Sequence, residues 1–386
     1  VRGCAALLGF ANLQPGSSHL DKLCNLLAGM EDSGLEALAG IVTGECSPNV
    51  LARHFIRPLV EHLSLGIKRS RNLPASGGSG QFCAEFVARI RARWQEDGHA
   101  VAKGSIADSV YYSKVVSSIK DDFLARDYLA WLSENMGNGI AAPFTFCSYP
   151  FLLSAYAKRR VMRIEAKIAM QRSMQNAMAR SFANMIRGDA AQESPYLAIM
   201  VRRSHLLADS VSIAGRLRDQ DLKKPLKVRF AGEAGVDAGG VTKEFFQLIS
   251  EQLFSPDYGM FVSVGPGNGT SWFSGVMYDG EGPFYLTGLL AGLAVYNGVI
   301  LDIHFPTVIY KKLLGQPVGM DELHDLDPQL GRSLTQILSL DSADDVECLC
   351  QTFEVSFTGI SGEEAKHELV EGGKDMDVTL DNRAEY

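Results

Sequence analysis

A strand, a glycine-rich turn and a helix follow one another within residues 226–261, and this unit constrains the fold more than any other stretch. In residues 226–230, leucine, valine and phenylalanine alternate with lysine and arginine, which is the period-two pattern of a half-buried strand. The turn ends in the pair Gly239-Gly240. Adjacent glycines allow backbone angles that a Cβ disfavours, so we expect a positive φ at one of them.

The helix predicted after this turn carries an apolar stripe with the spacing of a packed helix face. The stripe consists of Val241, Phe245, Leu248, Ile249 and Leu253. Pro256 and Gly259 then favour its end. A strand joined to an amphipathic helix in this way indicates a domain that contains both α and β structure.

An uncharged stretch of 18 residues, 284–301, allows two interpretations. Its Gly288-x-x-x-Gly292 spacing also occurs where helices pack in membranes. No basic cluster flanks the stretch, and Asp302 and His304 follow at once. We therefore expect a buried core helix that runs into a strand, and no membrane insertion.

Composition sets the broader limits. A chain of 386 residues is long enough for two or three domains with sizeable cores. Its net charge of -8 argues against a nucleic-acid-binding protein. Seven scattered cysteines, an odd number, are typical of reduced thiols rather than of a disulfide framework. With no signal peptide at its start, the chain is expected in the cytosol or nucleus, and its first residue, valine, suggests that it begins inside a longer protein.

The first 150 residues show helical patterns and no fixed-period repeat. Amphipathic helices are predicted at residues 18–30, after Ser47-Pro48, around residues 82–94, and at residues 115–132. Pro58 should kink or break the second of these helices. Nothing in this region indicates chemistry, so we expect it to support the fold or to bind partners.

The charge of the chain becomes positive between residues 157 and 203, which contain ten Lys or Arg and only three acidic residues. Methionines recur there near helical spacing, at Met162, Met170, Met174, Met178 and Met185. One interpretation is a basic, methionine-rich binding helix. We favour the alternative, in which the methionines pack against the core and the cations form a solvated face.

Several segments after the strand–turn–helix unit fall in the order seen in one family. They are Trp272-Phe273, residues 286–297, residues 301–306, residues 310–313 and residues 382–386. Together with the opening unit they resemble the HECT-type ubiquitin ligases, over about 165 residues. The aromatic run at residues 144–151 also resembles sequence upstream of this domain in ligases related to the E6-associated protein and the HERC group.

The resemblance implies a mostly helical α+β fold. An α-helical interaction or support region would occupy residues 1–195, followed by a lead-in helix at 196–221. Residues 222–386 would form most of the large lobe of the HECT domain, and the small catalytic lobe would be absent.

The implied activity is ubiquitin transfer through a cysteine thioester to a substrate lysine. Its partners would be ubiquitin, a ubiquitin-conjugating enzyme and protein substrates, and no cofactor or metal would be required. No cysteine here has the family's setting, threonine before it and asparagine two places after it, so the nucleophile is expected beyond Tyr386. The alternative is a non-catalytic helical scaffold that docks a conjugating enzyme.

Other candidates for chemistry are weak. Asp302 and His304 share one face of an extended segment, but a third metal ligand at a recognisable spacing is missing. Cys348-x-Cys350 is too tight for a zinc knuckle. Cys147 lacks a basic neighbour in the sequence, which favours a structural thiol.

The resemblance assigns four residues to the groove that receives the conjugating enzyme. They are Leu330, Leu334, Leu349 and Tyr386. Leu330 and Leu334 are four residues apart and would share one helix face. The alternative is that both leucines are buried inside a helical hairpin.

Overall fold

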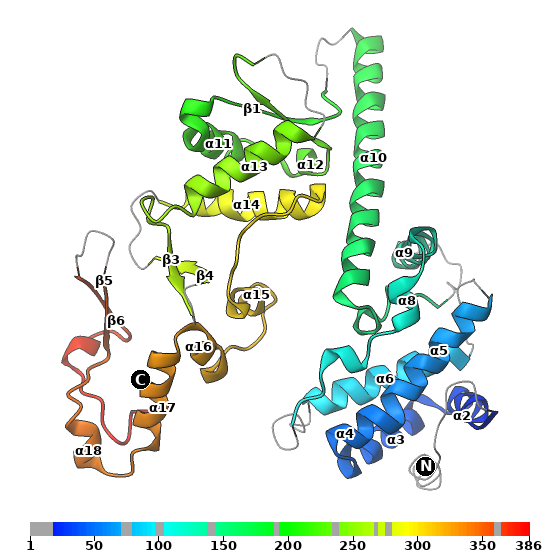
Figure 1. Cartoon of the computed structure of the whole chain (residues 1–386), viewed down its shortest axis with the longest axis horizontal. Coiled ribbons are helices and arrows are strands. Elements are labelled where there is room, and N and C mark those ends of the chain that lie inside the picture. The colour runs from blue at the N-terminus through cyan, green and yellow to red at the C-terminus, as the bar shows by residue number, and fades with distance from the viewer. Residues whose placement is uncertain are drawn as a thin grey trace. The chain divides into compact units, whose positions relative to one another are not determined.

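The structure is a computed structural model that describes residues 18–70, 79–96, 104–136, 144–188, 193–233, 239–265, 269–274, 280–358 and 364–386. The chain divides into two compact units, residues 1–169 and 170–386 (Figure 1). The described residues are mainly helical, with three small two-stranded sheets, so the predicted α+β class is confirmed. Among them, no helix has the length and apolar character needed to span a membrane.

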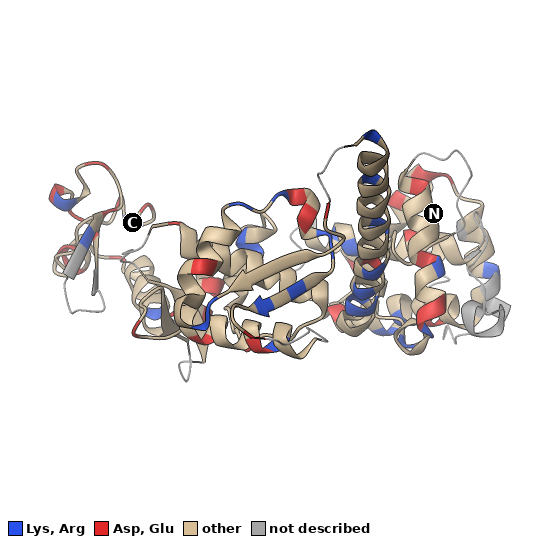
Figure 2. Cartoon of the chain, turned by 90° about the horizontal axis from the view of Figure 1, so that it is seen from above, with Lys and Arg blue, Asp and Glu red and all other residues tan. Residues whose placement is uncertain are grey.

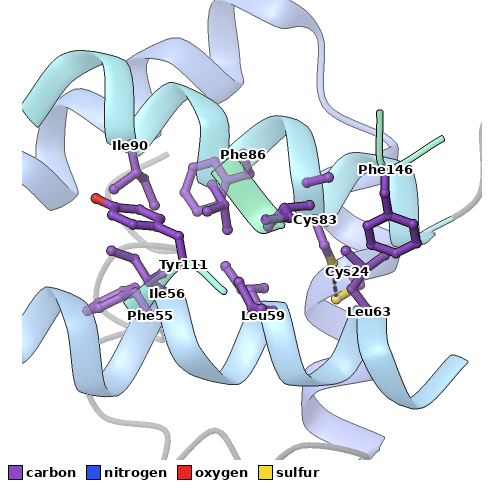
Figure 3. Packing of buried hydrophobic residues seen from close by; sticks show 14 of the residues in the cluster. Cys24, Phe55, Ile56, Leu59, Leu63, Cys83, Phe86, Ile90, Tyr111 and Phe146 are labelled. Carbon is purple, nitrogen blue, oxygen red and sulfur yellow. Dashed lines mark hydrogen bonds between the residues drawn. The ribbon is translucent and has the colours of Figure 1, made fainter. Parts of the chain in front are cut away.

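The first unit is helical. Its α-helices are α2 (Ser18–Ala28), α3 (Asp32–Glu45), α4 (Pro48–Val50), α5 (Arg57–Ser70), α6 (Ser79–Glu96), α8 (Lys114–Ser118) and α9 (Asp121–Asn135), and α10 (Ala155–Arg187) begins in it. Figure 3 shows Phe86 and Ile90 of α6 directed toward Phe55 and Leu59. All four side chains are almost fully buried, so the apolar stripes predicted from the sequence do form one core.

Two helix boundaries differ from the prediction. Pro58 does not break its helix, because the six residues before Arg57, Leu51–Ile56, widen into a π-helical segment that continues into α5. A π turn relocates the carbonyl that would clash with a proline ring. The single helix expected at residues 115–132 is instead two, because Ile119 leaves the helical conformation between α8 and α9.

Helix α10 corrects the prediction for the methionine-rich segment. Met162, Met178 and Met185 are between 51% and 67% exposed, so these methionines do not pack against the core. The helix is 33 residues long and buries only a few alanines. The second part of that prediction, solvated cations, is confirmed, because every Lys and Arg of this helix except Arg160 is exposed, and Figure 2 shows them along its length.

The second unit is built on a parallel pair of strands, β1 (Leu197–Val201) and β2 (Leu226–Phe230). Along the sequence, the two strands are separated by α11 (Leu206–Ala214) and α12 (Asp219–Leu222). The segment expected as a lead-in helix therefore starts with a strand, whose residues alternate between buried and exposed. Helices α13 (Gly240–Leu253) and α14 (Gly282–Asn297) complete the core of this unit.

The remaining elements extend the second unit. They are β3 (Phe261–Val264), β4 (Thr270–Phe273), α15 (Thr307–Leu313), α16 (Met320–Leu326), α17 (Pro328–Ser339), α18 (Ala343–Glu347), β5 (Glu354–Thr358) and β6 (Glu364–Glu368). The core helix predicted from the uncharged stretch is confirmed as α14. The strand expected after it is wrong, because residues 298–306 contain none.

The predicted turn geometry is confirmed at Gly239, which has φ +98° and immediately precedes α13. A Cβ added at this position would meet no atom within 4 Å, and the same holds at Gly240. The requirement for glycine at position 239 therefore comes from the backbone angle and not from crowding.

This geometry makes a matched pair of substitutions informative. Gly239→Val should lower the free energy of unfolding by about 1–3 kcal/mol, because valine resists a positive φ. Gly240→Val should cost clearly less, because Gly240 is not among the positive-φ glycines. Urea unfolding of both variants measures the difference, and equal losses would contradict this account of the turn.

Candidate functional site

Helices α16 and α17 form a hairpin that fixes the direction of the α17 surface. The Asp327 carboxylate accepts hydrogen bonds from the backbone N–H groups of Gln329 and Leu330, both at 3.0 Å. Pro328 occupies the first turn of α17, where its missing N–H costs nothing. A cap of this kind defines where a helix starts, so it sets which face α17 presents.

Close packing between the two helices depends on Gly331. A Cβ there would come within 2.8 Å of the His324 ring carbon Cγ and 3.0 Å of its Cα. The His324 ring is held in turn, because its Nδ1 lies 2.7 Å from the Met320 carbonyl oxygen. Gly331 is the one buried residue of α17, so the leucines of this helix contribute little to the hairpin interior.

The leucines instead form an apolar face on the outside of α17. Leu330 is 45% exposed, and Leu334, one turn later, is half-buried. Leu330 is therefore not buried inside the hairpin, whereas Leu334 is partly covered, and the groove role of both residues stays a prediction. Leu338, 42% exposed, lies one further turn along and extends the face. The 3.6-residue period could have identified Leu338 in the sequence, but the family resemblance did not point to it.

The other two predicted groove residues lie in different surroundings. Leu349, just after α18, is 41% exposed. Tyr386 is half-buried and packs edge-on against Phe353, with ring centroids 5.4 Å apart. It joins a small apolar cluster with Val346 and Val378. Residues 380–385, which precede it, form turns.

The part of the chain that contains α17 is rich in carboxylates. Residues 320–350 contain eight aspartates and glutamates and one basic side chain, Arg332. On α18 and beside it, Asp341, Asp344, Asp345 and Glu347 are all exposed. Apolar residues in a strongly acidic segment favour a partner that presents apolar residues together with lysine or arginine.

The six described cysteines differ in exposure: Cys24 and Cys83 are buried, Cys46 and Cys147 are half-buried, and Cys348 and Cys350 are exposed. Cys24 and Cys83 are buried against each other, with their Sγ atoms 2.8 Å apart (Figure 3). Burial and the nearby Asp127 carboxylate raise the pKa of the Cys147 thiol, as expected for a structural cysteine. Cys348 and Cys350 are exposed, but they follow the acidic residues of α18. Cys4 lies outside the described residues.

The Asp302 and His304 pair also lacks the features of a reactive centre. The two side chains are 3.7 Å apart and strongly exposed, at 99% and 68%. Within the described ranges, no three potential ligand side chains come together as a metal site would need. The exposed face of α17 is therefore the best-defined candidate site in the second unit.

The sequence of this chain is similar to those of known proteins. Residues 247–386 match the sequence profile of the HECT-domain (ubiquitin-transferase) family. Probable E3 ubiquitin-protein ligase HERC3 of Homo sapiens is 37% identical over 282 residues, which cover 72% of this chain and 26% of that protein. Probable E3 ubiquitin-protein ligase HECTD2 of Homo sapiens is 37% identical over 316 residues, which cover 78% of this chain and 39% of that protein.

A similarity also extends to fungi. Probable E3 ubiquitin-protein ligase mug30 of Schizosaccharomyces pombe is 36% identical over 244 residues, or 63% of this chain. The chain thus spans between about a quarter and two fifths of the length of these relatives. The matched profile begins within α13 and covers the helices and strands after it, including the α16–α17 hairpin. Residues 247–386 of this chain thus belong to the HECT-domain family.

Proposed function

We propose that this chain is the conjugating-enzyme-docking part of a HECT-type ubiquitin-protein ligase. The parent protein would accept ubiquitin from a conjugating enzyme as a cysteine thioester and pass it to a substrate lysine. The observation that carries the proposal is the exposed apolar face of α17, within a segment that matches the ubiquitin-transferase profile. Leucines on a capped, closely packed helical hairpin would form a preorganised anchor for a partner.

The chemistry of transfer requires a group that this chain does not supply in recognisable form. A transferring thiol must be exposed, activated and held against the incoming thioester. Cys24 and Cys83 are buried, Cys147 is half-buried, and neither Cys348 nor Cys350 has a basic residue next to it in the sequence. We therefore propose that the transfer cysteine is none of the seven in this sequence, and that the family's small lobe carries it.

The second candidate is a non-catalytic scaffold that docks a conjugating enzyme without accepting ubiquitin. The helical first unit and the absence of an activated thiol among the described cysteines favour it. Both candidates use the same α17 face, so they differ only in whether ubiquitin reaches the parent protein covalently. We prefer the ligase, because the relatives matching 72–78% of the chain are named as probable ligases.

If the conjugating enzyme docks at α17, substitutions there should weaken its binding without greatly lowering the stability of the fold. Leu330→Ala and Leu334→Ala together should weaken binding of a ubiquitin-conjugating enzyme by on the order of a hundred-fold, because truncating anchor residues costs about 2–4 kcal/mol at an interface. Loss of fold stability should stay well under the roughly 2–5 kcal/mol expected for a buried leucine. Calorimetric titration against a panel of conjugating enzymes measures the first effect, and thermal unfolding measures the second.

A suitable control is Leu313→Ala, because Leu313 of α15 is 77% exposed and lies outside the α17 face. This variant should bind the conjugating enzyme as the unmodified chain does. If the double variant unfolds at a much lower temperature, the leucines belong to the core and the docking site is elsewhere. If it binds normally, the α17 face is not the docking site.

A further inference from the structure

The first unit contains an open cavity of about 600 Å³, and four of its nine lining residues are basic. One wall is the turn between α8 and α9, residues 117–121, and the other is the first part of α10. The basic residues that line it are Lys120, Arg159, Arg160 and Arg163. Asp121 is the single acidic side chain in the lining.

Arg160 holds the two walls together. Its guanidinium forms an ion pair with Asp121 at 2.6 Å and donates to the backbone carbonyl oxygens of Ser117 and Ile119. It also lies 5.6 Å from the ring centroid of Tyr156. These contacts fix the cavity and neutralise the Asp121 carboxylate, so Asp121 does not compensate the other cations.

The other three cations have no such partner. Lys120, Arg159 and Arg163 are exposed, and none of them forms an ion pair with a carboxylate anywhere in the described parts of the chain. Three positive charges converging on one cavity form a site that attracts a dianion. The guanidinium fork of arginine matches the oxygens of a phosphate group better than it matches a single negative atom.

Two backbone features add to this positive potential. Helix α9 has 15 residues and starts at Asp121, so its amino-terminal end opens at the cavity. Helix α10 begins at Ala155, one residue before the lining residue Tyr156. The amino-terminal end of each helix carries a partial positive charge, which acts in the same direction as the arginines.

We propose that this cavity binds a phosphorylated serine or threonine in a peptide segment, and that it recruits phosphorylated substrates to the parent ligase. The recruitment part rests on the proposed function, whereas phosphopeptide binding does not. A flat membrane fits a protruding basic face better than cations that line a cavity. Nucleic acid needs a longer basic track than three side chains, and the net charge of -8 opposes it. The exposed ring of Tyr156 offers an apolar contact for a residue beside the phosphate.

The test uses the full 386-residue chain, immobilised and mixed with two peptide pools. One pool has a central phosphoserine flanked by randomised residues, and the other has serine at that position. The phosphorylated pool should be retained at least about ten-fold more strongly. The double variant Arg159→Gln/Arg163→Gln should lose this preference, because it removes the two guanidinium groups that can form paired hydrogen bonds with the phosphate.

The matched control is Lys158→Gln/Lys167→Gln, which removes two exposed charges from the same helix outside the cavity. This variant should keep the preference for phosphoserine, and circular dichroism should show that both double variants stay folded. Equal retention of the two pools would overturn the proposal. The same loss of phosphoserine preference in the control variant would also overturn it, because α10 would then act only through its overall charge. Binding to phosphoinositide-containing vesicles without binding to the phosphopeptides would replace it with a membrane site. A ligase that fails to transfer ubiquitin while still selecting phosphopeptides would refute the proposed function alone.

Discussion

Replacing Lys224 with alanine should destabilise the second unit by about 3–5 kcal/mol, the range measured when one partner of a buried ion pair is removed. Lys224 is only 4% exposed, and its Nζ lies 2.9 Å from Glu193 Oε1 and 2.7 Å from Asp221 Oδ1. Burial acts to lower the pKa of Lys224, but its hydrogen bonds to Asp221 and Glu193 outweigh this effect and raise it. Without the cation, two largely buried carboxylates face each other beside the start of β2.

The adjacent Lys223 provides the control, because its side chain is exposed. Lys223→Ala should change the midpoint of urea unfolding very little. Similar losses in the two variants would show that Lys224 contributes no more than a surface charge.

The stability that this ion pair contributes should also depend on pH. Hydrogen bonds from Arg218 and Lys224 hold the pKa of Asp221 below its ordinary 3.8. The contribution of a carboxyl with a lowered folded-state pKa is present above pH 3.8 and is lost as the pH falls through the folded value. The advantage of the unmodified chain over Lys224→Ala should therefore shrink below about pH 4.

The second large effect is expected at Asp127, in the first unit. This side chain is fully buried, and its two carboxylate oxygens accept the backbone N–H groups of Phe146 at 2.8 Å and Cys147 at 3.0 Å. Asp127→Ala leaves the buried Phe146 N–H and the partly buried Cys147 N–H without this acceptor, which should cost about 2–5 kcal/mol. Asp127→Asn keeps one acceptor oxygen and should cost less.

Asp122 is the control for this position, because it is an exposed aspartate on the same helix, α9. Thermal unfolding of Asp122→Ala should match that of the unmodified chain within a few degrees. Burial raises the pKa of Asp127 above 3.8, so its contribution is greatest at low pH and falls as the pH rises through the folded value. A loss in Asp127→Ala as small as in Asp122→Ala would contradict the bridging role.

The sequence predicts most accurately the features that depend on regular spacing. Helix α13 follows its apolar stripe, and the glycine pair located the positive φ at Gly239. Leu330 and Leu334 share a face because a four-residue interval brings any two side chains together on a helix. Local rules of this kind need no knowledge of the rest of the chain.

Features set by distant contacts are the ones that the sequence did not predict. Strand β1 is parallel to β2, whose first residue lies 29 positions after that of β1, and the segment was expected to be helical. Its period-two pattern at Leu197, Ile199 and Val201 was present, but five residues are too few to decide between a strand and a helix end. Tyr386 packs on Phe353 through tertiary contacts that spacing does not encode. The exposure of the α10 methionines is a further case, because a methionine repeat looks the same whether or not a partner covers it.

The central claim is that this chain docks a conjugating enzyme at α17 while another part of its parent carries the transferring thiol. It is tested most directly on a non-reducing gel, after incubation with ubiquitin, activating enzyme and a conjugating enzyme that binds the chain. The 386-residue chain should form no reductant-sensitive ubiquitin adduct. The same chain extended by a HECT small lobe should form one, and Leu330→Ala with Leu334→Ala should abolish it. A reductant-sensitive adduct on the unextended chain would contradict the account, and the cysteine that carries it would be the nucleophile.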